Sequence, residues 1–423
     1  MSEDAFLSDD LLSQITAAGD ADILVSVPTL NNAKTIEQVV RAVQVGLVKY
    51  FPRERAAIIV PDGGSKDGTP DLVRSLSMVD YRTLLTAPPL RTMHTLTTSY
   101  ASAAGQGMAL HLTFAAADLL RAKACGVVSA DLESITPEWI ESLIRPVYRE
   151  KFDFVSPIYQ RHKFDALMQG HVLAPFLAAT YGYEVQEPYA GEFALSGRLG
   201  ETFLNAEAWR RDFMRYGAQI WMIAHAMSGG FRLCQSFLGP KIHVNRASGL
   251  DLSEAIQQVV GALFNCLEAD QSLWMARDKV ETVPVFGFRY DVDLRPLRVE
   301  RKKMFQMFGT GVEHLGTVLE QILAPETLGR VREIAKLSEA EFRLPDELWV
   351  KINYDFAASF HRSVMNRDHI LQALTPLYRG RISSFLRENH EARVQEVRER
   401  LRALRIQFEQ LKPYLIERWN AGA

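Results

Sequence analysis

Short apolar runs alternate with amphipathic segments over about the first 135 residues, and this alternation constrains the fold more than any other feature. The runs at 22–30, 56–62 and 126–134 have the composition of strands. Segments 33–51 and 105–124 carry apolar residues at helical spacing. Because strands joined by helical crossovers pair in parallel, we predict an α/β fold with a mostly parallel sheet. Functional loops are expected at the carboxyl ends of its strands.

The pattern changes near residue 153, where strands and helices mix, and again near residue 251, where a capping box opens a helix. We predict a first domain over residues 1–250 and a mainly helical domain over 251–423. Within the first domain, a nucleotide-binding half is expected at about 20–135 and an acceptor half at about 136–250.

The last helix carries apolar residues at spacings of three and four from Val394 to Leu411. This pattern is typical of a helix that packs within its own domain, and also of a coiled-coil dimer. About three heptads are short for a coiled coil, which favours packing within the domain and leaves a homodimer as the alternative.

Composition excludes several classes of protein. A net charge of -3 gives no support to a nucleic-acid partner. The three cysteines lie far apart without a CxxC pair, which indicates a reduced compartment. No basic and apolar leader and no membrane span are evident, so a cytoplasmic protein is expected.

Polar or small residues follow two of the predicted strands. Asp62 ends the second strand and can accept a hydrogen bond from a base or a ribose, while Gly63 and Gly64 let the backbone approach a ligand. Small residues at 105–109 open a helix whose backbone N–H groups suit a phosphate. An ordinary turn explains the segment after Asp62 equally well, but the ends of the first two strands would line one crevice, which favours a binding site. For residues 105–109, ordinary helix initiation is the favoured interpretation.

Asp131 follows the third strand, and its carboxylate can bind a divalent metal. The residue two positions before it is Ser129, where a second acid would complete a pair. Ser134 or Thr136 is expected to cap the helix that begins at Pro137. Asp131 is therefore the functional candidate in this segment.

Two charged sites come later in the chain. Glu192 lies in an apolar stretch, where a carboxylate needs a partner or a ligand. Lys241 and His243 alternate on a predicted strand, so both are expected on one face. An imidazole there can bind a metal and a lysine can bind a phosphate, although a lone histidine more often has a structural role.

Taken in order, these motifs resemble those of retaining GT-A glycosyltransferases, in particular the group of mannosylglycerate synthase and glucosyl-3-phosphoglycerate synthase. That group shows GKG, DxD, a P-L-[AG]-G-E loop and a late metal-binding histidine. The counterparts here are GQG, SAD, PYAGE and KIHVN. The resemblance implies a GT-A (Rossmann-like) nucleotide-sugar-binding domain followed by a helical domain.

The resemblance also implies an activity: transfer of a hexose, with retention, from UDP-glucose or GDP-mannose to a small hydroxy acid such as D-glycerate, which makes a compatible solute. Mg²⁺ or Mn²⁺ is the implied cofactor, and catalysis would come from positioning and charge neutralisation. A lipid, polysaccharide or protein acceptor is one alternative. A catalytically silent nucleotide-sugar-binding protein is another.

Carried over residue by residue, the resemblance implies that Asp131 and His243 hold the metal. Contacts to the nucleotide are implied for seven residues, which lie at the ends of the first three predicted strands or at the start of the helix that begins at residue 105. They are Pro28, Leu30, Asn32, Asp62, Gly105, Gln106 and Asp131.

The catalytic positions implied by the resemblance are Glu192 and Gln219, and the acceptor positions are Arg161 and Gln169. Three positions depart from the family pattern, because Gln106 replaces a lysine and Ser129 and Gln219 replace acids. Each replacement removes a charge. An element that holds an acceptor phosphate in glucosyl-3-phosphoglycerate synthase is not found, which favours an unphosphorylated acceptor.

Overall fold

A computed structural model describes residues 7–77, 93–101, 105–244, 251–290, 294 and 300–421. The chain forms two compact units, each discontinuous in sequence. Unit 1 comprises Met1–Gln160, Tyr189–Ala247 and Val283–Val292, and unit 2 comprises Arg161–Pro188, Ser248–Thr282 and Asp293–Ala423. Residues 161–188, which the sequence analysis placed in the first domain, therefore belong to the helical unit. The reason is tertiary packing, since the helix over residues 174–181 packs on the helix over 394–410.

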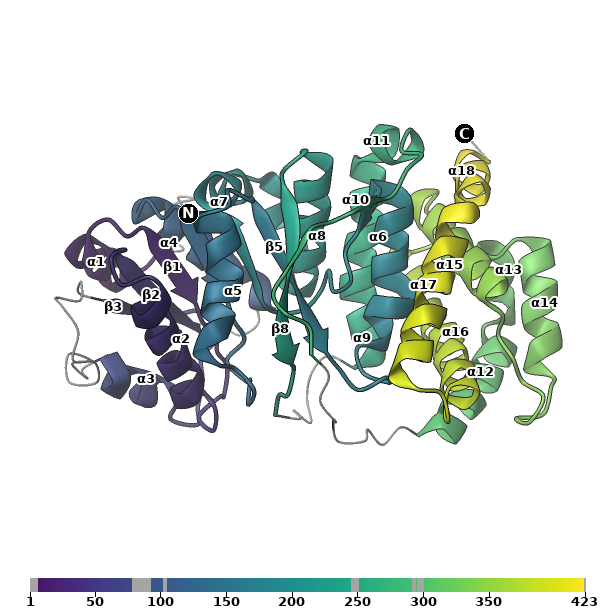
Figure 1. Cartoon of the computed structure of the whole chain (residues 1–423). Coiled ribbons are helices and arrows are strands. Elements are labelled where there is room, and N and C mark those ends of the chain that lie inside the picture. The colour runs from purple at the N-terminus through teal and green to yellow at the C-terminus, as the bar shows by residue number, and fades with distance from the viewer. Residues whose placement is uncertain are drawn as a thin grey trace. The chain divides into compact units, whose positions relative to one another are not determined.

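Unit 1 is built on a sheet that has eight strands among the described residues, in the order β10-β8-β5-β7-β4-β1-β2-β3 (Figure 1). All neighbouring strands are parallel except β7, which runs antiparallel to β4 and β5. The predicted α/β fold with a mostly parallel sheet is confirmed. The strands are β1 Ile23–Ser26, β2 Ala56–Asp62, β3 His94–Ser99, β4 Ala124–Val127, β5 Phe154–Gln160, β7 Phe193–Ser196, β8 Leu233–Pro240 and β10 Val285–Phe286.

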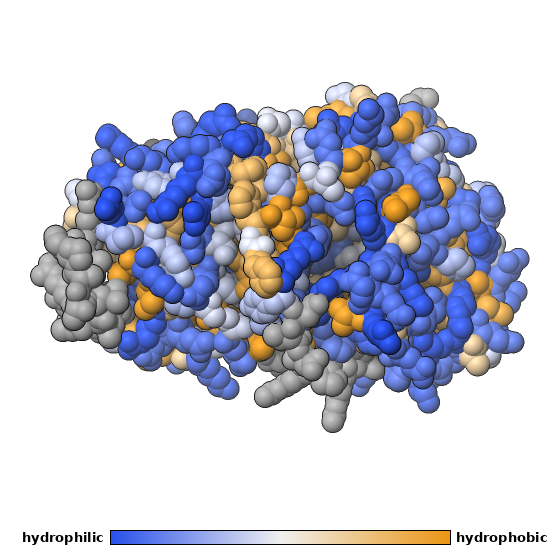
Figure 2. Space-filling view, in the orientation of Figure 1, coloured by the Kyte–Doolittle hydropathy of each residue, from blue (hydrophilic) through white to orange (hydrophobic). Residues whose placement is uncertain are grey.

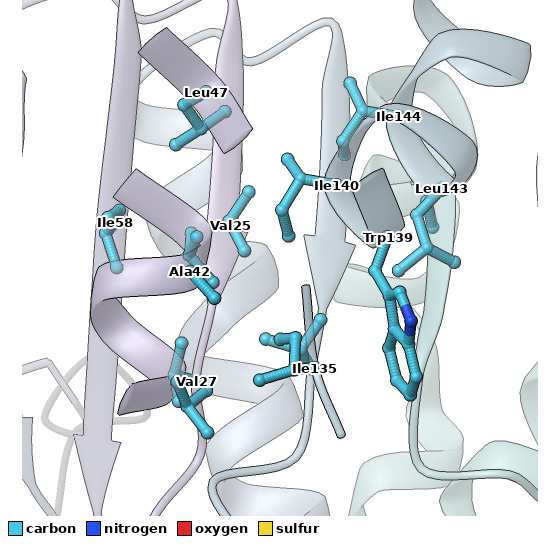
Figure 3. Close-up of a cluster of buried hydrophobic side chains, with 14 of the residues drawn as sticks. Val25, Val27, Ala42, Leu47, Ile58, Ile135, Trp139, Ile140, Leu143 and Ile144 are labelled. Carbon is cyan, nitrogen blue, oxygen red and sulfur yellow. The ribbon is translucent and has the colours of Figure 1, made fainter. Parts of the chain in front are cut away.

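Helices cover this sheet. A large apolar core lies between the helices α2 and α5 on one side and the strands β1, β2 and β4 on the other. The side chains of Leu47, Val25 and Ile140 meet in this core (Figure 3). Gly46 allows the close approach, because a Cβ there would lie 2.7 Å from Cβ of Ile140. The helices of unit 1 are α1 Asp9–Ala18, α2 Ile36–Tyr50, α3 Thr69–Ser77, α4 Gly105–Leu119, α5 Pro137–Tyr148, α7 Gly197–Leu204, η4 Glu207–Arg210 and α8 Met214–Ser228.

Unit 2 is helical in its described part, apart from the short strands β6 Tyr183–Glu184 and β9 Glu281–Thr282, which pair with each other. The predicted helical C-terminal region is thus present. Its helices are η3 Gln169–Leu173, α6 Ala174–Tyr181, α9 Leu252–Ala255, η5 Ile256–Val260, α10 Gly261–Ala269, α11 Gln271–Met275, α12 Arg301–His314, α13 Gly316–Ile322, α14 Pro325–Ala335, α15 Asp346–His361, α16 Arg367–Glu388, α17 Val394–Gln410 and α18 Lys412–Asn420.

The last long helix, α17, buries Val397, Leu404 and Phe408 and packs on α6 of the same unit. These three residues of its apolar stripe are therefore buried within unit 2. On the molecular face in Figure 2, hydrophilic residues predominate and hydrophobic ones form smaller groups. Within the described residues, every helix is too short or too polar to cross a membrane.

Asp22 joins three neighbouring strands of unit 1 at their amino ends. Its carboxylate accepts hydrogen bonds from the backbone N–H of Arg55 at 3.0 Å, from Nε of Arg55 at 3.2 Å and from Nζ of Lys123 at 3.0 Å. These residues immediately precede β1, β2 and β4. The Arg55 hydrogen bonds hold the pKa of Asp22 well below its usual range, with Lys123 adding to the effect.

We expect Asp22→Asn to lower the free energy of unfolding by about 2 kcal/mol at pH 7, because three donors lose a charged acceptor. A carboxylate with a lowered pKa stabilises the fold above its unfolded-state pKa and loses that contribution as the pH falls. The difference between wild type and variant should therefore shrink below about pH 4. Urea unfolding at pH 7 and pH 3 measures this difference in the free energy of unfolding. The control is Glu138→Gln, which breaks the exposed ion pair with Lys49.

Candidate functional site

A cavity lies at the carboxyl ends of β1 and β4, and we call it the β1–β4 cavity. All of its lining residues belong to unit 1. Carboxyl ends of parallel strands are where ligands bind in open α/β sheets. The lining residues are Pro28, Thr29, Leu30, Asn32, Tyr100, Gly105, Gln106, Val127, Val128, Ser129, Ala130, Asp131, Gly191 and Tyr216.

Six of the seven predicted nucleotide contacts line this one cavity. They come from the loop after β1, the first turn of α4 and the end of β4, which are far apart in sequence: Pro28, Leu30, Asn32, Gly105, Gln106 and Asp131. The seventh, Asp62, is not among the lining residues, and its side chain bonds to the loop that follows it. Its Oδ1 accepts from the backbone N–H groups of Gly64 and Ser65 at 2.9 and 2.7 Å, and its Oδ2 accepts from the Ser65 hydroxyl at 2.5 Å.

The loop after β1 is held by Asn32. Oδ1 of Asn32 accepts from the backbone N–H of Leu30 at 2.9 Å and from the hydroxyl of Thr29 at 3.0 Å. The backbone N–H of Asn32 donates to the Thr69 hydroxyl at 2.9 Å, which ties the loop to α3. Asn32 therefore shapes this wall of the cavity as well as lining it.

The glycines of the GQG motif let α4 approach the start of α8. Gly105 has a φ of +70°, and a Cβ there would lie 2.7 Å from the carbonyl oxygen of Arg215. A Cβ on Gly107 would lie 2.0 Å from the carbonyl oxygen of Met214. The helix begins at Gly105, as predicted, and close helix packing gives both glycines a structural role that the sequence analysis did not consider.

The structure brings Asp131 and His243 into neighbouring segments. Leu132 and His243 form an isolated antiparallel bridge, and the N–H of Val244 donates to the carbonyl of Asp131 at 3.0 Å. The Ser134 hydroxyl accepts from the N–H of Ile242 at 2.9 Å. Ser134 therefore holds the 242–244 segment and does not cap α5, and Thr136 occupies the cap position without a side-chain cap bond.

This pair offers one carboxylate and one imidazole as metal ligands. Among the described residues there is no group of three or more acidic, histidine or cysteine side chains that could hold a metal ion. Hard divalent cations also accept phosphate and water oxygens as ligands. The donor set fits a metal shared between the protein and a bound phosphate better than a closed protein cage.

Glu192 is fully buried and is absent from the lining of the cavity. Its Oε2 accepts from the Tyr159 hydroxyl and from Nζ of Lys241, each at 2.5 Å. Burial raises the pKa of Glu192, but the Lys241 charge and hydrogen bonds from Lys241, Ser129 and Tyr159 outweigh it and lower the pKa below its ordinary value. Lys241 is thus the partner that the buried carboxylate requires.

Lys241 and His243 do not share a face, contrary to the sequence analysis. The Lys241 side chain is 9% exposed and points to Glu192, whereas His243 is exposed. The reason is that β8 ends at Pro240, so the two-residue alternation of a strand does not continue to residue 243.

Gln219 lies on α8 and is buried, and its Oε1 accepts from the backbone N–H of Gly191 at 3.0 Å.

The predicted acceptor residues lie in unit 2. Arg161 donates to both carboxylate oxygens of Glu187 at 2.7 to 3.0 Å and to Asp165 at 3.0 Å. Gln169 is buried at the start of η3. Arg161 is therefore already paired with two carboxylates of the protein.

Tyr100 and Tyr216, which no sequence motif indicated, both line the cavity. Tyr100 follows β3, and its hydroxyl lies 3.3 Å from where a Cβ on Gly63 would be. Burial raises the pKa of Tyr100 to about 12, with a smaller contribution from the Asp62 charge, so its phenol is a neutral donor at physiological pH. The signal for Tyr100 was weak because β3 has a single buried hydrophobic residue, Leu96.

No family model matches the chain, and no curated protein matches it either. Solved structures of glucosyl-3-phosphoglycerate synthase from Mycobacterium tuberculosis are similar. One, with Mn²⁺, UDP and phosphoglyceric acid, has a TM-score of 0.45 and 24% identity, over 60% of this chain and 82% of that one. Another, with Mn²⁺, UDP-glucose and phosphoglyceric acid, has a TM-score of 0.45 and 22% identity, over 62% and 85%.

Proposed function

We propose that this protein is a GT-A glycosyltransferase that binds a nucleotide diphosphate sugar in the β1–β4 cavity. It transfers the hexose, with retention, to a small hydroxy acid such as D-glycerate. The donor is UDP-glucose or GDP-mannose, and the metal is Mg²⁺ or Mn²⁺.

One observation carries the proposal: six residues chosen from sequence motifs for nucleotide contact line a single cavity at the carboxyl ends of parallel strands. They come from three segments of the chain that only folding brings together. The cavity combines small residues at the start of the 15-residue helix α4 with the carboxylate of Asp131. Helix amino ends favour phosphate, and a carboxylate favours a metal or a ribose hydroxyl.

In this proposal Asp131 and His243 hold the metal, which neutralises charge on the diphosphate leaving group when it is bound. The start of α4 faces the diphosphate with its positive end. Gln106 offers an amide in place of a cation, so its side chain could donate a hydrogen bond to the diphosphate but would add no positive charge. The protein positions the acceptor on the face from which the diphosphate departs, and positioning supplies much of the rate.

A catalytically silent nucleotide-sugar-binding protein is a second candidate. Asp131 is the one acidic residue among the fourteen that line the cavity, and Ser129 and Gln106 are neutral. A binding protein needs the cavity but not the chemistry.

A donor panel tests the proposal. UDP- and GDP-sugars, each with and without Mn²⁺, are added to the full chain and the melting temperature is recorded, since a ligand that binds the folded state raises it. We expect one donor to raise it in a Mn²⁺-dependent way and to release nucleotide diphosphate when D-glycerate is added. Binding without turnover would favour the silent protein, and no binding by any donor would contradict both.

A further inference from the structure

One peptide bond in the wall of the β1–β4 cavity is fixed from both sides by side chains. The bond joins Ala190 to Gly191, and Gly191 lines the cavity. Its carbonyl, on Ala190, accepts from Nζ of Lys241 at 2.5 Å. Its N–H, on Gly191, donates to Oε1 of Gln219 at 3.0 Å. A peptide group has one donor and one strong acceptor, so both are occupied by the protein.

The two side chains come from different parts of unit 1. Gln219 lies on α8 and is 6% exposed, and Lys241 follows β8 with a side chain that is 9% exposed. Lys241 is itself anchored by its ion pair with the fully buried Glu192. Neither Gln219 nor Lys241 lines the cavity. Both residues contact the Ala190–Gly191 peptide, so they can act on a ligand in the cavity through this peptide.

Gly191 lies close to Ser129, the position where the family pattern has an acid. Gly191 has a φ of +90°, and a Cβ there would lie 2.7 Å from Oγ of Ser129 and 3.7 Å from Nζ of Lys241. The backbone at 191 therefore sets how much room remains beside Ser129 and, two residues on, beside Asp131. A rotation of this peptide would narrow or widen that end of the cavity.

We propose that Gln219 and Lys241 are positioning residues that fix the Ala190–Gly191 peptide, and that this peptide sets the width of the cavity beside Ser129 and Asp131. The proposal rests on the proposed function for the identity of the ligand, which at this end would be the sugar diphosphate. The loop after β1 and Tyr100 would hold the nucleoside. The two neutral replacements at 129 and 219 then belong to one structural arrangement.

The test compares Gln219→Leu, which removes the acceptor for the Gly191 N–H, with Gln219→Glu, which keeps an acceptor oxygen. Gln44→Leu is the matched control, because Gln44 is a buried glutamine on α2 of the same unit and lies outside the cavity lining. Two quantities are measured on the full chain: hydrogen exchange of the Gly191 amide, and the affinity for UMP, GMP, UDP-glucose and GDP-mannose with Mn²⁺.

In Gln219→Leu we expect the Gly191 amide to exchange at least tenfold faster, and the affinity for the nucleotide sugar to fall about tenfold, because one buried hydrogen bond is lost. Affinity for the nucleoside monophosphate should stay within about twofold, which a general loss of structure would not allow. Gln44→Leu should keep both properties of the wild type, and Gln219→Glu should keep the slow exchange of the Gly191 amide, because a carboxylate oxygen still accepts from it.

Unchanged Gly191 exchange in Gln219→Leu, or an equal loss of affinity for monophosphate and nucleotide sugar, would overturn the proposal. If the wild type binds none of these nucleotides, the proposed function fails, and the exchange rates of Gly191 still decide whether the peptide is held by Gln219. The failures of the two proposals are therefore distinguishable.

Discussion

Replacing Asp131 with alanine is expected to abolish Mn²⁺-dependent binding of the nucleotide sugar and to lower its affinity by about 100-fold. Asp131 is the one carboxylate in the cavity lining, and a hard divalent cation depends on oxygen ligands. The contact of Asp131 with Val244 is made by its backbone carbonyl, which alanine keeps. Calorimetry with UDP-glucose and GDP-mannose, at several Mn²⁺ concentrations, measures the effect.

Glu133→Ala is the matched control for this experiment. Glu133 is an exposed acid two residues away, and it joins the neighbouring segment through its backbone N–H, which donates to Ile242. We expect it to bind donor and metal as the wild type does. Metal-dependent affinity that survives in Asp131→Ala would remove Asp131 from the metal site and with it the proposed arrangement of the diphosphate.

Replacing Lys241 with methionine is expected to destabilise the protein by about 3 to 5 kcal/mol, because it leaves the fully buried Glu192 without its cation. The loss should depend on pH. Without Lys241, burial raises the pKa of Glu192 above its unfolded-state value, so the carboxyl becomes neutral and tolerable at low pH. The deficit should be smallest below about pH 4 and grow as the pH rises. Urea unfolding across this range measures it.

The double variant Lys241→Met with Glu192→Gln separates charge from packing. It removes both members of the pair, and we expect it to recover most of the stability lost in the single variant. Equal stability of single and double variants would show that the ion pair with Glu192 is not what makes Lys241 important.

Periodic features of the chain allowed the fold to be predicted. The first two βα units were predicted because their strands are β-branched and buried and their helices have regular apolar stripes, as in α2. Strand β3 was missed because it has a single buried hydrophobic residue, so its alternation is weak, and among the described strands it pairs with β2 alone. The membership of residues 161–188 in unit 2 depends on tertiary packing of α6 against α17, which local pattern does not encode.

Residues of the candidate site were predicted where a motif specifies a strand end or a helix start, as for Asp131 and Gly105. What the sequence did not reveal was which groups satisfy one another. Glu192 was recognised as a carboxylate that needs a partner, but its partner Lys241 is 49 residues away. The role of Gln219 as the acceptor for Gly191 depends on where α8 lies, and α8 is placed by contacts with Gly105 and Gly107.

A crystal structure of the full chain with Mn²⁺ and a nucleotide sugar tests the central claim most directly. Anomalous scattering locates the manganese independently of the nucleotide. We predict that the manganese lies between Asp131, His243 and the diphosphate, and that the nucleoside lies against the loop after β1 and Tyr100. Manganese or nucleotide bound away from the β1–β4 cavity would contradict the claim that this cavity is the donor site.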